Sequence, residues 1–209
     1  MRVISGEARG RKFLVPNGDT VRPTSDRVRE AIFDVLGHLG GVVGARVLDL
    51  FAGSGAFGIE SLSRGAAEVV FVDQERKVIK TIAENLVAVK LETAGDIKIV
   101  QSDAIAFCRI HQSERPTTPD HPVGPSRPGP RGFDITFCDP PYSFANWPKL
   151  LGVIPGELLV LESSGPVELP GTFEVYRVYR YGTTLITVAN RQRGSDVDIP
   201  LSPEILEST

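Results

Sequence analysis

The chain has 209 residues, of which 41% are hydrophobic and 23% are charged. This composition is ordinary for a folded domain, and no apolar stretch approaches the ~18 residues of a membrane span. Because the first residues also lack a signal-peptide core, we expect a cytoplasmic protein without membrane contact. The oligomeric state is not readable from the sequence, and a monomer is the default expectation. The net charge of −3 argues against a protein that binds nucleic acid through bulk electrostatics.

The cysteines and histidines indicate neither a disulfide framework nor a metal centre. Cys108 and Cys138 are far apart in the sequence and form no CxxC pattern, so we expect two reduced thiols, with Cys138 buried on a strand. The three histidines show no metal-ligand spacing. We therefore predict no metal site.

Basic residues concentrate at the start of the chain. Residues 1–31 carry seven basic and four acidic side chains, whereas the remaining residues carry 16 basic and 22 acidic ones. A locally basic module on an acidic body fits phosphate contact in one place, although a solvated surface without a ligand would show the same pattern.

Residues 1–40 predict a hairpin followed by a helix. Residues 2–5 and 12–15 flank a turn that contains two glycines. Ser25 or Thr24 can cap the helix, whose apolar residues recur at helical spacing as far as Gly40.

From residue 45 onward, predicted strands and helices alternate. We expect helices at 57–64 and about 74–89, and buried strands at 46–50, 68–72, 96–100, 133–138 and 158–161. Apolar strands separated by helices indicate a parallel sheet covered on both faces. Residues 173–181 and 183–191 are β-rich and separated by Gly182 alone, so they predict an antiparallel hairpin. Five parallel strands closed by such a hairpin predict the Rossmann-like α/β fold of class I methyltransferases, with a mostly parallel seven-stranded sheet.

Two segments lie outside this pattern. Residues 111–132 are rich in proline and predict a flexible surface insertion, for which a neutral loop expansion is favoured over a specific binding arm. Residues 196–209 form an acidic tail that we expect to fray. The predicted organisation is an N-terminal module of residues 1–40, a catalytic domain of residues 41–195 that carries the insertion, and the tail.

A glycine loop follows the first strand of the catalytic domain. Residues 53–58, Gly-Ser-Gly-Ala-Phe-Gly, match the GxGxxG of dinucleotide-binding proteins, and Asp73 lies about 20 residues on, where a ribose-binding acid is expected. A nicotinamide dehydrogenase is therefore a local rival. Asp49 argues for another ligand, because an acid disfavours a pyrophosphate but suits a cationic amino-acid group such as the methionine part of S-adenosylmethionine.

Four aspartates fall at or just beyond the ends of the first four strands: Asp49, Asp73, Asp103 and Asp139. Open parallel sheets bind ligands at this edge. Asp103 alone could be a helix cap, but four acids at successive strand ends around a glycine loop indicate a binding site.

The fourth strand ends in Asp139-Pro140-Pro141-Tyr142, which predicts a catalytic loop. The Asp139 carboxylate and the Pro140 carbonyl can accept from an exocyclic amine and stabilise the positive charge that develops on its nitrogen during attack. Prolines hold such a carbonyl rigidly, and Tyr142 can stack on a base taken out of its helix. The alternative reading is an ordinary turn, since Asp-Pro pairs are common in turns.

With these motifs the chain resembles the bacterial RsmD-type methyltransferases, which modify the N2 amine of a guanine in small-subunit ribosomal RNA. The resemblance covers nearly the full length and includes Tyr181-Gly182. Its most discriminating segment is residues 22–33, which begins Arg-Pro-Thr-Ser-Asp. Two departures stand out: Asp73 replaces the glutamate usual in the family, and the insertion 111–132 is longer than the usual connection.

The resemblance implies three sets of site residues and a substrate. The catalytic set is Asp139, Pro140, Pro141 and Tyr142. The set that would bind S-adenosylmethionine is Asp49, Phe51, Gly53, Ser54, Gly55, Asp73, Gln74, Asp103 and Ala104, with Asp73 on the ribose and Asp103 on the adenine amine. The set that would contact the ribosomal RNA backbone is Arg2, Arg11, Lys12, Arg22, Arg27 and Arg29. The implied substrate is ribosomal RNA within the assembled small subunit.

Other functions remain open. An adenine-N6 methyltransferase acting on DNA would use the same Asp-Pro-Pro-Tyr, because the motif reports an amine on a planar ring without naming the base. A small-subunit assembly factor that retained the fold without catalysis is a rival of another class. For the methyltransferase reading we expect direct in-line transfer without a covalent enzyme intermediate, because neither cysteine lies in a nucleophile context.

Overall fold

The structure is a computed structural model that describes residues 1–15, 25–111, 132–192 and 205–207. The predictions made for Arg22, for most of the insertion 111–132 and for most of the tail 196–209 lie outside these ranges.

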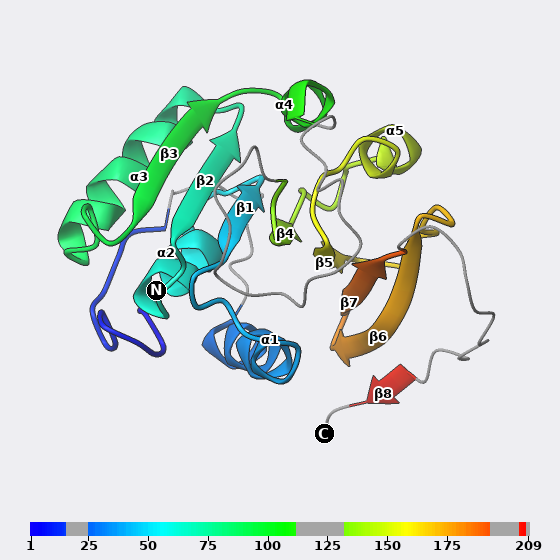
Figure 1. Cartoon of the computed structure of the whole chain (residues 1–209), viewed down its shortest axis with the longest axis horizontal. Coiled ribbons are helices and arrows are strands. Elements are labelled where there is room, and N and C mark those ends of the chain that lie inside the picture. Colours follow the sequence, from blue (N-terminus) through cyan, green and yellow to red (C-terminus); the bar gives the residue numbers. More distant parts are fainter. Residues whose placement is uncertain (16–24, 112–131, 193–204, 208–209) are drawn as a thin grey trace.

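The described elements follow the predicted alternation (Figure 1). They are α1 (Asp26–His38), β1 (Arg46–Leu50), α2 (Ala56–Ser63), β2 (Glu68–Asp73), α3 (Arg76–Ala88), β3 (Asp96–Gln101), α4 (Ala104–His111), β4 (Ile135–Cys138), α5 (Trp147–Leu151), β5 (Leu158–Ser163), β6 (Phe173–Tyr181), β7 (Thr184–Arg191) and β8 (Ile205–Glu207). Every predicted strand of the catalytic domain is present, with boundaries shifted by up to two residues. β4 begins later than expected, and the Asp134 carboxylate before it accepts from the Arg46 backbone N–H at 2.7 Å. α4 and α5 were not among the predicted helices.

One mixed sheet has the strand order β3-β2-β1-β4-β5-β7-β6-β8. The first five strands of this order are parallel, and β7 pairs antiparallel with both β5 and β6. The predicted sheet with its antiparallel hairpin is confirmed. One short strand is added at the edge of the predicted seven, because Ile205–Glu207 of the tail pair in parallel with β6.

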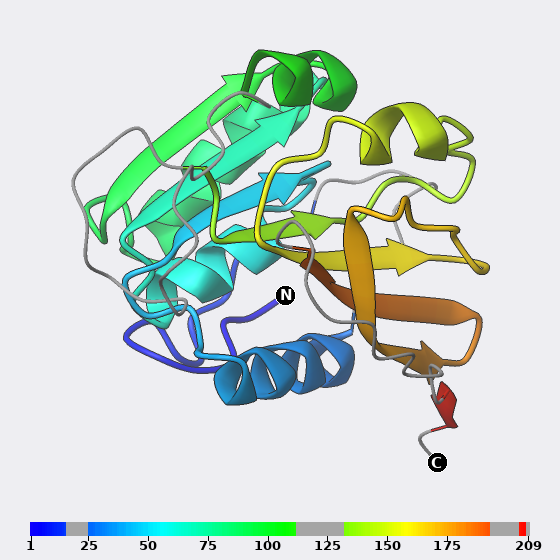
Figure 2. The same cartoon turned by 45° about the vertical axis from the view of Figure 1, so that its right-hand side comes forward.

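Helices cover both faces of the sheet (Figures 1 and 2). α1, α2 and α3 lie on one face, and α4 and α5 lie on the other. Strand residues alternate between the two cores: Val69 and Phe71 of β2 belong to the core under α1 to α3, whereas Val70 and Val72 belong to the core under α4 and α5. A strand buried on both sides has no polar face, which explains the continuous apolar runs in the sequence.

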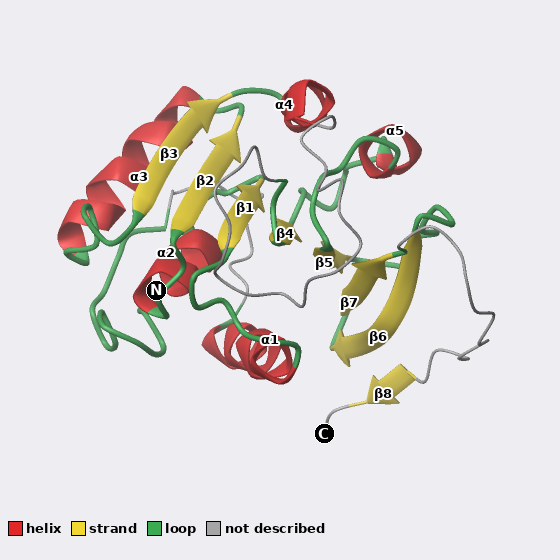
Figure 3. Cartoon of the chain, viewed as in Figure 1, coloured by secondary structure: helices red, strands yellow, loops and turns green. Residues whose placement is uncertain are grey.

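The N-terminal module differs in part from its prediction. α1 begins as expected, because the Val28 N–H donates to the Ser25 side chain at 3.3 Å. The first 15 residues turn back on themselves as predicted, but the pairing is shorter than expected: one antiparallel bridge joins Arg2 and Lys12, and backbone hydrogen bonds beside it join residues 1–3 to residues 10–13 (Figure 3). This segment is held by α2 and α3, whose side chains accept its backbone N–H groups. None of the helices within the described ranges is long and apolar enough to cross a membrane.

Gly58 tests the packing between α2 and the sheet. A Cβ atom at this position would overlap the buried ring of Phe71. We expect Gly58→Ala to lower the free energy of unfolding by ~1–3 kcal/mol, the usual cost of overpacking a core, as measured by urea denaturation. The matched control is Gly37→Ala in α1, where the added methyl group would meet no atom within 4 Å apart from the backbone of its own helix and its chain neighbours, and the higher helix propensity of alanine should stabilise by up to ~1 kcal/mol. Equal effects of the two substitutions would contradict this account.

Candidate active site

The register of the parallel strands brings the predicted acids to one edge of the sheet. Leu50 at the end of β1 pairs with Val72 of β2 on one side and with Cys138 of β4 on the other. The three strands therefore end at the same level, and the residues that follow them lie together at this edge of the sheet, where open parallel sheets bind ligands. Asp73 and Asp139 lie at this edge, with the glycine loop between their strands.

The glycine loop turns sharply from β1 into α2. Gly53 and Gly55 have φ values of 54° and 78°, in the left-handed region that glycine adopts without a steric cost. Phe51 shares this region with φ 58°, a conformation that costs a non-glycine residue about 1–3 kcal/mol and that occurs most often at functional sites. The loop is thus held in an unusual shape immediately after the strand end.

Asp73 connects the glycine loop to the end of β2. Its Oδ2 accepts from the Gly53 N–H at 3.1 Å, and its Oδ1 accepts from the Glu75 N–H at 2.9 Å. Each oxygen keeps a second lone pair, so the half-buried carboxylate can still accept from a ligand hydroxyl.

Asp103 is a helix cap, the alternative that its sequence context allowed. Its Oδ1 accepts from the Ala106 N–H at 2.9 Å and so begins α4. The Asp103 side chain is exposed beside the strand ends, whereas Ala104, the first residue of α4, is buried. A capping role leaves the second carboxylate oxygen of Asp103 able to accept from an amine.

Asp49 lies beneath the glycine loop. Its side chain is 2% exposed, and its Oδ2 accepts from the Gly58 N–H at 2.9 Å. Burial raises the pKa of Asp49 to about 8, the hydrogen bond from Gly58 lowers it, and the negative charge of Asp73 raises it further. A cationic ligand bound nearby would favour the ionised form of this carboxyl group.

Two other residues of the predicted cofactor set, Ser54 and Gln74, contact other parts of the protein. Ser54 is buried, and its hydroxyl points to the Met1 Sδ at 3.6 Å, so the Ser54 side chain faces the N-terminal segment. Gln74 is exposed after β2, and its carbonyl accepts from the Gln101 side chain at 3.2 Å.

The Asp139–Tyr142 loop continues from the end of β4. Asp139 is half-buried, Pro140 is buried and Tyr142 is 49% exposed. The Tyr142 hydroxyl lies 3.1 Å from the Thr184 hydroxyl at the start of β7, which ties the loop to the β6–β7 turn. A pocket of about 260 Å³ opens beside the loop and is lined by Pro140, Pro141, Tyr142, Phe144, Trp147 and residues 163–167.

An aromatic chain that the sequence analysis missed joins the two loops. The Phe51 ring meets the Phe144 ring edge-on at 5.3 Å, and Phe144 meets Trp147 edge-on at 5.1 Å. Such pairs add to the stability gained by burial alone. The only sequence signal is the recurrence of aromatic residues three to eight positions beyond Asp139, which does not identify Phe51 as their partner.

Both cysteines are buried and free. Burial raises the pKa of Cys108 to about 12 and the pKa of Cys138 well above its ordinary value. Both thiols are therefore protonated at neutral pH and unreactive, because the thiolate is the nucleophilic form. Within the described residues, no group of three or more histidine, cysteine or acidic side chains could hold a metal ion.

The predicted contact between Arg29 and RNA is contradicted. Arg29 is fully buried, and its Nη2 donates to the Arg2 carbonyl at 2.6 Å and to Asp26 at 3.1 Å. Its guanidinium also lies 6.0 Å from the Phe13 ring centroid. Because position 29 is on the inner face of α1, Arg29 anchors the N-terminal segment and cannot reach a phosphate.

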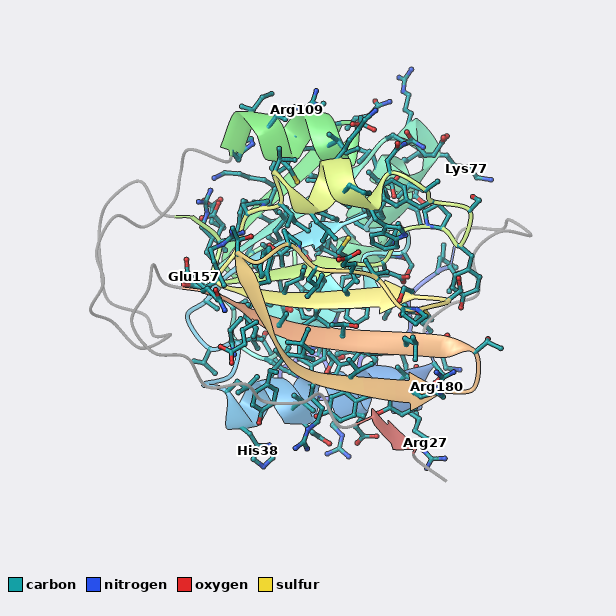
Figure 4. All side chains as sticks on the ribbon, turned by 90° about the vertical axis from the view of Figure 1, so that its right-hand side faces the viewer. Arg27, His38, Lys77, Arg109, Glu157 and Arg180 are labelled. Carbon is teal, nitrogen blue, oxygen red and sulfur yellow. The ribbon has the colours of Figure 1, made fainter. Side chains whose placement is uncertain are left out.

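The other described basic residues of the predicted RNA set lie nearer the surface. Arg2, Lys12 and Arg27 are exposed, whereas the half-buried Arg11 donates to the Val89 carbonyl at 2.6 Å. Figure 4 shows Arg27 of α1 and Arg180 of β6 at the same corner of the molecule. Arg180 was not predicted, because nothing local in the sequence places β6 at the same corner as α1.

The family model described as "Conserved hypothetical protein 95" matches residues 1–190. The chain belongs to this family. Its resemblance to the RsmD-type methyltransferases is confirmed by two relatives. It is 36% identical over 203 residues to the "Putative rRNA methyltransferase YlbH" of Bacillus subtilis, covering 92% of this chain and all of that protein. It is 38% identical over 142 residues to the "Ribosomal RNA small subunit methyltransferase D" of Escherichia coli, covering 68% of this chain and 60% of that protein.

A solved structure agrees with the family assignment. The "Putative methyltransferase yhhF from Escherichia coli" shares 31% sequence identity with this chain at a TM-score of 0.71, covering 92% of this chain and 98% of the other. The predicted class I methyltransferase fold is confirmed by this likeness together with the strand order.

The raised pKa of Asp49 predicts how stability depends on pH. A carboxyl group whose pKa rises on folding favours the folded state most below its unfolded pKa of about 4, and this contribution is lost as the pH rises through about 8. We expect Asn at position 49 to keep the acceptor for Gly58 without acquiring charge. Between pH 4 and 8, Asp49→Asn should therefore gain stability relative to the unsubstituted protein, by at most ~1.4 kcal/mol per pH unit.

Chemical denaturation across this pH range measures the difference. Asp96→Asn serves as the control, because the Asp96 side chain is 63% exposed on β3 and lies away from the glycine loop. Parallel pH profiles for Asp49→Asn and the unsubstituted protein would show that burial does not raise this pKa.

Proposed function

We propose that this protein transfers a methyl group from S-adenosylmethionine to the exocyclic N2 amine of a guanine in small-subunit ribosomal RNA. The observation that carries the proposal is the position of Asp139–Tyr142, at the end of a strand adjacent to the one that leads into the glycine loop. This arrangement occurs in a chain whose relatives include a protein named as a small-subunit ribosomal RNA methyltransferase.

The residues at the sheet edge fit S-adenosylmethionine better than a dinucleotide. Asp49, Asp73 and Asp103 are all acids, and the two glycines with positive φ let the backbone approach a ligand closely. Asp73 suits the ribose of either ligand, but Asp49 favours the cationic methionine group, because a nearby cation stabilises the ionised form of this carboxyl group and a pyrophosphate disfavours it. In this assignment Asp73 accepts from the ribose hydroxyls and Asp103 accepts from the adenine amine.

The catalytic loop would hold the guanine and polarise its amine. S-adenosylmethionine supplies a methyl group already activated by its sulfonium. The Asp139 carboxylate and the Pro140 carbonyl accept from the two N2 hydrogens and stabilise the charge that develops on nitrogen, while Tyr142 stacks on the ring. Asp139 does not have to be a strong base, because an arylammonium product loses its proton readily. Positioning of the reactants supplies most of the remaining catalysis.

The pocket beside the loop has room for part of an extruded nucleotide. Its wall of Tyr142, Phe144 and Trp147 presents the aromatic surface on which unpaired bases stack. The bond from Tyr142 to Thr184 holds this wall in place, which reduces the entropy lost when a base stacks on it.

The RNA backbone would be contacted by the exposed basic residues of the N-terminal module, extended by Arg180. Arg2, Lys12 and Arg27 form part of this surface, and Arg29 supports it from inside. A modest basic surface on an acidic protein fits an assembled small subunit, where shape contributes to recognition. The assembled substrate, a monomeric protein and a cytoplasmic location stay predictions.

Methyl transfer from radiolabelled S-adenosylmethionine tests the function. The acceptors are small ribosomal subunits that lack the modification, naked ribosomal RNA and duplex DNA, and nucleoside analysis identifies the product. We expect N2-methylguanosine, formed with assembled subunits in preference to naked RNA. Label in N6-methyladenine would support the DNA methyltransferase, and binding to subunits without any label would support the assembly factor.

Substitution of Asp139 tests its catalytic role. We expect Asp139→Ala to lower kcat by at least ~10²-fold, because the amine loses an acceptor for its developing charge. The dissociation constant for S-adenosylhomocysteine, measured by calorimetry, should change little. Tyr142→Phe is a milder companion, since it keeps the stacking ring and removes only the contact with Thr184. Loss of cofactor binding in a folded Asp139→Ala protein would place Asp139 in the cofactor site instead.

The salt dependence of binding tests the basic surface. Each phosphate contact contributes about one unit to the slope of log K against log salt concentration, so Lys12→Ala should reduce the slope by about one. Lys80→Ala on α3 is the control, because the Lys80 side chain is 79% exposed and lies outside the proposed surface. An unchanged slope for Lys12→Ala would remove Lys12 from the RNA contact.

A further inference from the structure

Asn85 of α3 joins the N-terminal segment to the glycine loop. Its side chain is fully buried, and its Oδ1 accepts from the Leu14 N–H at 2.8 Å. Its Nδ2 donates to the Leu14 carbonyl at 2.9 Å and to the Ser54 carbonyl at 2.9 Å. Both N–H groups of one amide are therefore used, one on each segment.

The glycine loop has a second contact with the same N-terminal segment. The Ser54 hydroxyl points to the Met1 Sδ, to which the buried Arg29 also donates. Ser54 is thus contacted by Met1 of the N-terminal segment and by Asn85, which binds that segment. Gly53 and Gly55 allow the backbone several conformations, and these contacts help to hold the loop in the one observed.

Other anchors of the N-terminal segment do not reach the glycine loop. Glu60 accepts from the Ile4 and Ser5 N–H groups, at 2.8 and 3.0 Å. Ser63, at the far end of α2, accepts from the Ala8 N–H and donates to the Ser5 carbonyl. These bonds dock the segment on α2, and Asn85 alone among the described side chains bonds to both Leu14 and Ser54.

We propose that Asn85 is a positioning residue that couples docking of residues 1–15 to the cofactor-binding shape of the glycine loop. If the segment undocks, the buried amide loses its partners at Leu14, and the restraint on Ser54 weakens with it. Cofactor binding therefore favours the docked form of residues 1–15 and so tightens the binding of RNA to that segment. Because coupling free energies are reciprocal, bound RNA tightens cofactor binding by the same factor. The identity of the two ligands rests on the proposed function.

Hydrogen exchange measures the coupling without RNA. The amides of residues 1–15 are followed by mass spectrometry with and without saturating S-adenosylhomocysteine. In the unsubstituted protein we expect exchange to slow by at least ~5-fold on binding, the lower end of typical coupling factors. Asn85→Asp preserves the shape and the acceptor for Leu14 but turns an oxygen toward the carbonyls of Leu14 and Ser54, so the slowing should disappear.

Two further variants separate coupling from stability. Ser63→Ala removes two bonds to the N-terminal segment without touching the glycine loop, and it should speed exchange in both states while keeping the ratio between them. Leu14→Pro removes the N–H that Asn85 binds, at a side chain that is 63% exposed, and it should lower the ratio even if Asn85→Asp fails to fold. A ratio equal to that of the unsubstituted protein in either Asn85→Asp or Leu14→Pro overturns the proposal.

The reciprocal measurement uses the substrate. Addition of unmodified small subunits should lower the dissociation constant for S-adenosylhomocysteine, by an equal factor in the unsubstituted protein and in Ser63→Ala. In Asn85→Asp the dissociation constant should not fall. Binding of S-adenosylhomocysteine without any change in exchange contradicts the coupling alone. Absence of binding to the unsubstituted protein contradicts the proposed function and the coupling together.

Discussion

The level ends of β1, β2 and β4 are the constraint on which the site depends. Because Leu50 pairs with both Val72 and Cys138, the chain must leave three neighbouring strands at one height. The glycine loop, Asp73 and Asp139 follow from these exits, and the hydrogen bond from Gly53 to Asp73 closes the loop over the adjacent strand. A slip of one residue in this register would turn every side chain of a strand to the opposite face and separate these groups.

Buried polar side chains play a complementary part on the N-terminal side. Glu60, Ser63, Asn85 and Arg29 are nearly inaccessible to water, and each bonds the backbone or side chains of the first 15 residues. Their hydrogen bonds fix the position of a segment that has little secondary structure of its own. Because a buried polar group without a partner is costly, this segment and the helices beneath it depend on one another for stability.

Periodicity and motif spacing predicted the sheet, the hairpin and the glycine loop, because these depend on local patterns of apolar residues and glycine. Contacts between distant segments were not predictable in this way. Arg29 had the charge expected of an RNA contact, but its burial depends on how α1 rotates against the sheet. In the sequence, Asn85 occupies a polar position of a predicted helix, and no local sequence pattern indicates that its side chain reaches Ser54. The pairing of β8 with β6 likewise depends on a return of the chain that no local pattern specifies.

The proposed function requires one cationic and one anionic ligand, and the charges near the sheet edge bear on where each would bind. The sheet edge is acidic, and one of its acids, Asp49, is so deeply buried that its pKa lies near 8. Such a carboxyl group ionises most readily when a cation comes close, so it favours a positively charged ligand over a phosphate. Arg2, Lys12 and Arg27 are exposed on the N-terminal module, and Arg27 shares a corner of the molecule with the half-buried Arg180, although exposed lysines such as Lys80 also lie elsewhere. In the proposed function, the RNA backbone stays on the basic N-terminal module, and an extruded base is the part of the RNA that approaches Asp139.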